Sequence, residues 1–160
     1  MFEIKAPLRY QRTYLLGKNI FLAGSIEMGK AENWQERIAR ELKDCQVNIF
    51  NPRRDDWDSS WTQSINDKNF NEQVTWEMDH LLDYCDIVVF YFDPKTQAPI
   101  TLLELGLIAG NSEYRNKQIC VCCPDGFWRK GNVEMVCDRF NLQLVNDIDT
   151  MISWLKDRVI

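Results

Sequence analysis

The sequence has little histidine, no excess of basic residues and no long apolar run. Only one histidine, His80, occurs among the 160 residues, and no G-x-S-x-G motif is present. A Ser-His-Asp hydrolase is therefore disfavoured. The formal net charge is −5, with 19 basic against 24 acidic residues. This balance argues against a nucleic-acid polymer or a membrane surface as partner, because both attract basic patches.

Other motifs are also missing. No apolar run approaches the ~20 residues of a membrane-spanning helix, and the segment from Met1 to Pro7 lacks the basic and apolar regions of a signal peptide. We therefore expect a cytoplasmic protein without a membrane partner. Neither a G-x-G-x-x-G nor a G-x-x-x-x-G-K-[ST] occurs, which disfavours dinucleotide-dependent oxidoreductases and P-loop NTPases. We expect no cofactor.

The cysteines do not form a convincing metal site. Cys120 and Cys123 have C-x-x-C spacing, but residues three apart on a strand point to opposite faces. A single histidine leaves no second pair of ligands. We therefore predict no metal, no disulfides and a core role for these small side chains. The six cysteines are Cys45, Cys85, Cys120, Cys122, Cys123 and Cys137.

Short apolar segments alternate with helical patterns along the chain. The alternation predicts parallel strands joined by right-handed crossovers, and hence an α/β fold. We predict a doubly wound, five-stranded parallel sheet in the flavodoxin-like order 2-1-3-4-5. An N-terminal arm over 1–18 would precede one domain over 19–160. Strands are expected at 20–23, 44–50, 86–92, 117–123 and 141–145, and helices after the caps Asn33 and Asp147 and over 70–85, 100–110 and 133–140.

Polar loops follow the first four predicted strands. In a parallel sheet these loops meet at the carboxyl edge, where such proteins bind ligands. They hold Gly24-Ser25, 53–57, 93–104 and 128–132. The stretch 53–61 contains two arginines, three aspartates and two tryptophans, a concentration of hydrogen-bonding and stacking groups. A solvated loop packed over its tryptophans is the structural alternative.

Glu104 is the centre of the functional prediction. It is a single acid in the first turns of an apolar helix, which follows the apolar strand 86–92 after the loop 93–99. Glu77 lies on or beside the inward face of helix 70–85, where a carboxylate needs a partner or a ligand. Retaining glycosyl-transferring enzymes use a carboxylate nucleophile. We expect the helix N-terminus to keep Glu104 ionised. A capping role or an ion pair with an arginine is the alternative.

Several motifs, in chain order, resemble the nucleoside 2-deoxyribosyltransferase superfamily, and most closely its nucleoside 2-deoxyribosyltransferase-like branch. The resemblance covers residues 19–145 and implies a flavodoxin-like fold and a covalent glycosyl-enzyme. Glu104 would attack C1′ of a (2′-deoxy)nucleoside, Glu77 would bind sugar hydroxyls, and a free nucleobase or water would accept the sugar. The motifs are IFLAGS at 20–25, NPRRD at 51–55, Trp76-Glu77, DIVVF at 86–90 and LELG at 103–106.

The resemblance also implies further contacts. Gly24 and Ser25 would line the sugar end of the pocket. Asn132 falls near an asparagine that reaches into a neighbouring subunit's site, which implies a homo-oligomer. Asp79 is included as a candidate for substrate binding although its helical position is expected to face solvent. The other candidate substrate-binding residues are Arg53, Arg54, Asp55, Trp57, Asp93 and Trp128.

Three departures from the family pattern leave the substrate open. Phe21 replaces a tyrosine that contacts the nucleophile, and the segment 97–99 lacks the base-contacting aspartate. Glu27 occupies the place of an arginine that binds a 5′-phosphate in related N-glycosidases. This disfavours a phosphate, although other basic residues lie at the same edge. The favoured hypothesis is deoxyribosyl transfer or hydrolysis on a nucleoside. The alternatives are a nucleoside 5′-monophosphate N-glycosidase and a non-catalytic nucleotide-binding module.

Overall fold

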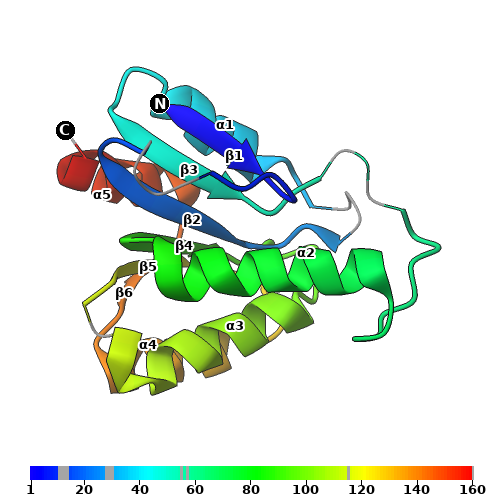
Figure 1. Cartoon of the computed structure of the whole chain (residues 1–160). Helices are drawn as coiled ribbons and strands as arrows, with labels where there is room; N and C mark the ends of the chain where they lie inside the picture. Colours follow the sequence, from blue (N-terminus) through cyan, green and yellow to red (C-terminus); the bar gives the residue numbers. More distant parts are fainter. Residues whose placement is uncertain (11–14, 28–30, 55, 57, 115, 160) are drawn as a thin grey trace.

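A parallel sheet with helices on both faces forms the centre of the molecule (Figure 1). The computed structural model describes residues 1–10, 15–27, 31–54, 56, 58–114 and 116–159. Over these ranges the sheet has six strands in the order β1-β3-β2-β4-β5-β6. The strands are β1 (Phe2–Lys5), β2 (Lys18–Gly24), β3 (Val47–Asn51), β4 (Ile87–Tyr91), β5 (Gln118–Cys122) and β6 (Gln143–Val145).

The predicted α/β class and the order of the five predicted strands are confirmed, because β3-β2-β4-β5-β6 is the order 2-1-3-4-5. The strand count of five is wrong. Part of the expected N-terminal arm forms β1, which pairs in parallel with β3 at the sheet edge, Ile4 opposite Phe50. Mixed charge hid this strand in the sequence: Glu3 and Lys5 flank Ile4, the one fully buried residue of the four. The domain boundary at residue 19 stays a prediction.

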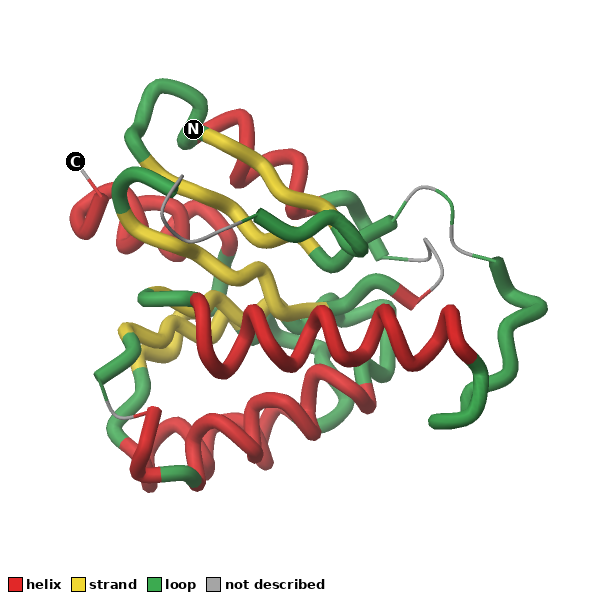
Figure 2. The backbone as a smooth tube through the Cα atoms, in the orientation of Figure 1, coloured by secondary structure: helices red, strands yellow, loops and turns green. Residues whose placement is uncertain are grey.

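The helices form two layers, because successive residues of each buried strand point to opposite faces. Helices α2, α3 and α4 cover one face, and α1 and α5 cover the other (Figures 1 and 2). A π-helical turn, His80–Tyr84, continues α2 directly. The α-helices are α1 (Trp34–Glu41), α2 (Lys68–Asp79), α3 (Pro99–Gly110), α4 (Lys130–Phe140) and α5 (Ile148–Val159).

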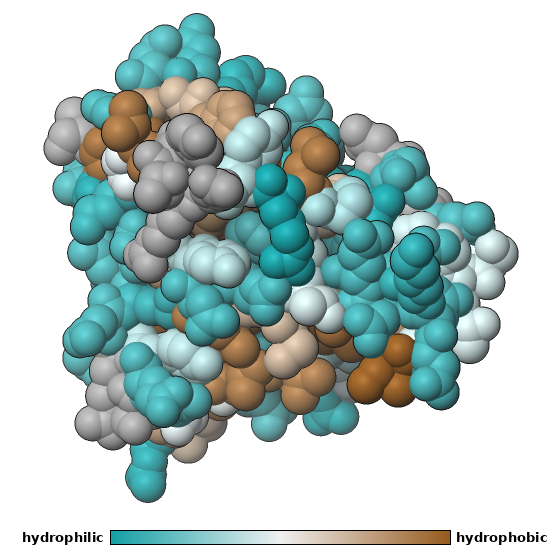
Figure 3. Space-filling model, in the orientation of Figure 1, coloured by the Kyte–Doolittle hydropathy of each residue, from teal (hydrophilic) through white to brown (hydrophobic). Residues whose placement is uncertain are grey.

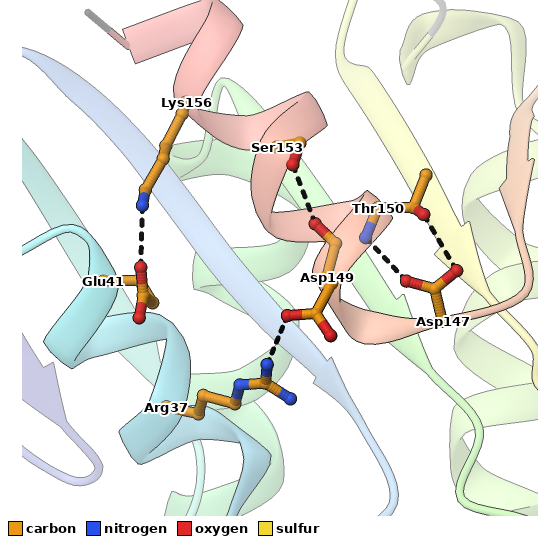
Figure 4. A network of polar contacts seen from close by, with 7 residues as sticks. All are labelled: Arg37, Glu41, Asp147, Asp149, Thr150, Ser153 and Lys156. Atoms are coloured by element: carbon orange, nitrogen blue, oxygen red, sulfur yellow. Dashed lines mark hydrogen bonds and ion pairs between the residues drawn. The ribbon is translucent and has the colours of Figure 1, made fainter.

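Local capping explains where two helices begin. The Asn33 side chain accepts a hydrogen bond from the Glu36 amide at 3.3 Å, and Asp147 accepts one from the Thr150 amide at 2.7 Å. Both predicted caps are therefore confirmed. Figure 4 shows the α1–α5 side of the molecule, where Arg37 pairs with Asp149 and Lys156 with Glu41. Such exposed pairs add little stability.

Gly24, the last residue of β2, is closely packed against its neighbours. A Cβ atom there would lie 2.6 Å from Trp34 Cζ2 and 2.6 Å from the Tyr91 carbonyl oxygen. We expect Gly24→Ala to lower the free energy of unfolding by about 2–3 kcal/mol, because backbone must shift to admit the methyl group. Gly106→Ala in α3 is the control, since nothing lies within 4 Å of its Cβ position.

Denaturant unfolding of both variants measures this effect. The control is expected to keep its stability or to gain up to about 1 kcal/mol from better helix propensity. Equal losses in the two variants would show that Gly24 has no special packing role.

Candidate active site

Two half-buried carboxyls, on helices that cover the same face of the sheet, form an acid pair. Glu104 lies on α3 and Glu77 on α2, and these helices cover the same face of the sheet (Figure 1). Burial raises the pKa of Glu104 to about 8, and the negative charge of Glu77 adds to the increase. Burial also raises the pKa of Glu77 to about 7. The two carboxyls are therefore close enough to interact, and the pair retains protons near neutral pH.

The sequence of α3 explains how a carboxyl reaches this position. Thr101, Leu105 and Ile108 are buried on the sheet-facing side of the helix. Glu104 immediately precedes Leu105 and is half-buried beside that face. Its side chain is thus held at the flank of a helix that is otherwise apolar or neutral.

The expectation that the helix N-terminus keeps Glu104 ionised is wrong. The favourable field of a helix end acts within the first turn. Helix α3 begins at Pro99, so Glu104 lies beyond that turn. Desolvation is consequently the larger influence, and it favours the protonated carboxyl.

Another carboxylate, Glu27, holds the segment that leads into α3. Its Oε1 accepts hydrogen bonds from the backbone amides of Gln97 and Ala98, both at 2.6 Å. Ala98, the residue before the helix, has a left-handed conformation with φ 46°. Glu27 therefore fixes the backbone that enters α3, including the amide of its N-cap residue Ala98. This explains the acid at a position where the sequence comparison suggested a phosphate-binding arginine.

Ser25 and Asp93 are bonded inside the protein. Ser25 Oγ accepts hydrogen bonds from the Asp93 amide at 3.0 Å and from Thr96 Oγ1 at 2.7 Å. The Asp93 carboxylate accepts from the amides of Lys95 and Glu32 at 2.8 and 3.3 Å. Ser25 is 1% exposed and Asp93 4%. These predicted substrate contacts join the loops after β2 and β4 and, with Gly24, set the shape of the edge.

Arg53 has similar internal partners. Its guanidinium donates to the backbone carbonyls of Ala31 and Glu32 at 3.4 and 3.3 Å, and to Gln35 Oε1 at 3.3 Å. It ties the loop after β3 to the start of α1. Asp55 and Trp57, the other predicted contacts of this loop, lie outside the described residues.

Arg54 connects the same loop to the acid pair. It donates two hydrogen bonds to Asp56, at 2.9 and 2.8 Å, and its guanidinium lies 5.0 Å from the ring centroid of Trp61. Its Nη1 donates to Gln73 Oε1 at 3.3 Å, and Gln73 Nε2 donates to Glu77 Oε1 at 2.7 Å. The sequence analysis missed Gln73. Its spacing of one helical turn from Glu77 was the available signal.

Other predicted residues lie away from the pair. Asp79 follows Glu77 by two positions, which turns it by about 200° around the helix, and it pairs with Arg9 at 2.7 Å. Trp128 Nε1 donates to the Gln97 carbonyl at 3.0 Å.

Asn132 lines a groove of about 350 Å³ between α3 and α4. Leu102 and Gly106, which also line this groove, flank Glu104 by two positions on either side, so the groove opens on another side of α3.

The described part of the chain contains no group of three or more His, Cys, Asp or Glu side chains arranged to hold a metal ion. Within the same ranges, no helix has both the length and the apolar character needed to cross a membrane.

His80 is buried, and its ring stacks on Trp76 with the ring centroids 4.1 Å apart. Burial lowers the pKa of His80.

Comparison with known protein families identifies the family of the chain. A family model described as "Nucleoside 2-deoxyribosyltransferase like" matches residues 17–127. The matched stretch runs from β2 past β5 and contains both members of the acid pair. No curated protein matches the chain.

Proposed function

Because the chain belongs to the nucleoside 2-deoxyribosyltransferase-like family, we propose that it cleaves the N-glycosidic bond of a (2′-deoxy)nucleoside through a covalent intermediate on Glu104. The family itself indicates glycosyl transfer at nucleosides. The observation that carries the finer proposal is the half-buried Glu77–Glu104 pair, on helices α2 and α3, which precede and follow strand β4. A carboxylate in low dielectric stabilises an adjacent oxocarbenium-like centre strongly.

The proposed reaction has two displacements at C1′. In the first, a Glu104 oxygen forms a bond to C1′ while the bond between C1′ and the base nitrogen breaks, and the base leaves with that electron pair and takes up a proton. In the second, a nitrogen of another base, or a water oxygen, bonds to C1′ and the carboxylate leaves. The incoming group loses a proton, so charge balances over the cycle.

Glu77 supplies the second carboxyl. Two adjacent carboxyls do not ionise together readily, so the pair keeps one proton after its first ionisation. The pKa values of about 7 for Glu77 and about 8 for Glu104 put most of that charge on Glu77 in the free protein. The reactive form, with the charge on Glu104 and the proton on Glu77, is therefore the less populated arrangement of the singly charged pair. A protonated Glu77 can donate to a sugar hydroxyl or help to protonate the departing base. The active form in this proposal is the pair with one negative charge.

The contacts at the sheet edge favour a nucleoside over its 5′-monophosphate. A phosphate dianion needs cationic groups that are free to turn toward it. Arg54 is paired with Asp56, Arg53 donates to backbone carbonyls, and Glu27 places a further acid near the start of α3. We therefore propose a neutral nucleoside as substrate, with the monophosphate as the second candidate.

Product analysis tests the proposal. The protein is incubated with 2′-deoxynucleosides and with their 5′-monophosphates, with and without a second free base, and bases are followed by chromatography. Release of base from the nucleosides, with exchange when a second base is present, supports transfer, and release without exchange supports hydrolysis. Binding without any release would support the non-catalytic alternative instead.

We also propose that the protein is a homo-oligomer, with the outward side of α3 as part of the contact. Ile100, Leu103 and Leu107 on this side are 60%, 68% and 41% exposed. A helix that is apolar on all sides is normally covered. Figure 3 shows hydrophobic residues gathered in the lower part of the view, where α3 and α4 lie.

Replacing Leu103 with lysine is expected to shift the protein toward the monomer, because a charge in an apolar contact loses hydration. Size-exclusion chromatography with light scattering measures the change. Ile65→Lys is the matched control, since Ile65 is 78% exposed in the loop before α2. A wild-type protein that is monomeric at all concentrations would overturn the proposal.

A further inference from the structure

Gln73 is a buried amide between Glu77 and the loop after β3. It is 1% exposed. Its Nε2 donates to Glu77 Oε1 at 2.7 Å and to the Pro52 carbonyl at 3.2 Å, and its Oε1 accepts from Arg54 Nη1 at 3.3 Å. Every polar atom of the side chain therefore has a partner of the matching type.

These partners permit only one orientation of the amide. Arg54 is always a donor, and the Pro52 carbonyl is always an acceptor. A flipped amide would place two oxygens, from Gln73 and Pro52, against each other and an NH₂ group against a guanidinium. Arg54 itself is fixed by its two hydrogen bonds to Asp56 and its position over Trp61. The NH₂ group of Gln73 is thereby directed at Glu77.

We propose that Gln73 is a positioning residue that fixes the orientation of Glu77 in the reaction and couples it to the Arg54–Asp56 ion pair. This inference rests on the proposed function, since Glu77 matters catalytically only if the acid pair acts on a substrate. Gln73 itself does not touch the substrate in this proposal. It acts through Glu77.

The orientation has a chemical consequence. Because Glu77 Oε1 accepts the amide hydrogen bond, the proton of a neutral Glu77 resides on Oε2, which is the oxygen left for the substrate. The same bond favours the ionised carboxyl and so opposes the effect of burial on the pKa of Glu77. Gln73 thus lowers the pH at which the pair releases its first proton.

The charged groups around Glu77 come from several elements. Glu104 lies on α3, and the charge of Glu77 raises the pKa of Glu104. Arg54 and Asp56 belong to the loop after β3 and neutralise each other. Glu72 on α2 acts on Arg54. Removing the Gln73 donor changes none of these charges, so its effect on Glu77 can be isolated.

The test compares Gln73→Met with wild type. Methionine approximates the shape of glutamine but lacks the donor. Glu77 is followed by NMR of ¹³C-labelled carboxyl groups, assigned with Glu77→Gln. We expect the pKa of Glu77 to rise by about one, the size of effect that a lost hydrogen bond to a charged group produces. The acid limb of the pH–rate profile is expected to move to higher pH by up to about one unit.

Two further variants complete the experiment. Gln143→Met, at an exposed glutamine of β6, is the control and should change neither quantity. Arg54→Met removes the cation that orients the amide and should raise the same pKa, which keeps the test informative if Gln73→Met does not fold. An unchanged Glu77 pKa in a folded Gln73 or Arg54 variant would overturn the inference.

The NMR measurement needs no turnover, so the two proposals can fail separately. A raised Glu77 pKa in a protein that never releases base from a nucleoside would support the contact with Gln73 and overturn the proposed function. Turnover with an acid limb that Gln73→Met leaves in place would support the function and overturn the positioning role.

Discussion

Glu104→Gln is expected to lower kcat for base release by about 10⁴-fold, the order of loss seen when a covalent nucleophile is removed. Glutamine keeps the shape of the side chain but cannot form the glycosyl ester or neutralise the positive charge that develops at C1′. Steady-state assays with saturating deoxynucleoside measure the effect. Glu134→Gln, at an exposed acid on α4, is the control and should retain full activity.

The same variant should also be more stable, which separates lost chemistry from lost structure. The pKa of Glu104 rises from its ordinary 4.5 to about 8 on folding. Between these values the folded chain holds a proton that the unfolded chain has released, so the free energy of unfolding falls as pH increases. Replacing the carboxyl by an amide should thus raise the free energy of unfolding at pH 8 by about 2 kcal/mol. This value is smaller than the full pKa shift would give, because Glu104 is only half-buried and solvent screens its charge.

At pH 4 the gain should vanish, because both states are then protonated at Glu104. Thermal or denaturant unfolding at the two pH values tests this directly. An inactive variant that is less stable than wild type at both would mean that Glu104 is primarily a structural residue.

The second large effect concerns pH. If the active pair carries one negative charge, kcat/KM should rise to a maximum between the two pKa values of the pair, about 7 and about 8. At pH 5 the fraction of free protein with one ionised carboxyl is about 60-fold smaller than at the maximum, and kcat/KM should fall accordingly. Above pH 8 the second ionisation should lower it again.

Glu77→Gln provides the diagnostic comparison. With one carboxyl left, the profile should still rise as Glu104 ionises. The rise should occur at lower pH than in wild type, because the repulsion from Glu77 is gone, and the fall at high pH should disappear. A wild-type profile that is flat from pH 5 to 9 would contradict a role for the pair. Buffers of constant ionic strength are needed, together with a check that the protein stays folded across the range.

The sequence predicted the central strands of the sheet better than its edge strand, β1. Apolar runs such as 86–92 are unambiguous because β4 is buried on both faces, and the alternation with helices determined the strand order. Strand β1 was missed because it is short, charged and paired only with β3. Its pairing depends on a neighbour far away in the chain, which local patterns do not report.

The acid pair was predictable in part. A lone glutamate in an apolar helix, and another beside the inward face of the preceding helix, indicated Glu104 and Glu77. Their ionisation was not predictable, since it depends on desolvation and on the distance between two helices. The sequence also gave no sign that Ser25, Asp93 and Arg54 would be bonded within the protein, because loop contacts such as the one from Thr96 to Ser25 join residues distant in the chain.

The claim that Glu104 forms a covalent bond to the sugar has one most direct test. The protein is mixed with a 2′-deoxynucleoside without acceptor base, quenched in acid during turnover, digested, and analysed by mass spectrometry. We predict a deoxyribosyl group on the peptide that contains Glu104, absent from Glu104→Gln and removed when a second base is added before the quench. Rapid release of base with no adduct at any time, or with the adduct on another residue, would contradict the account.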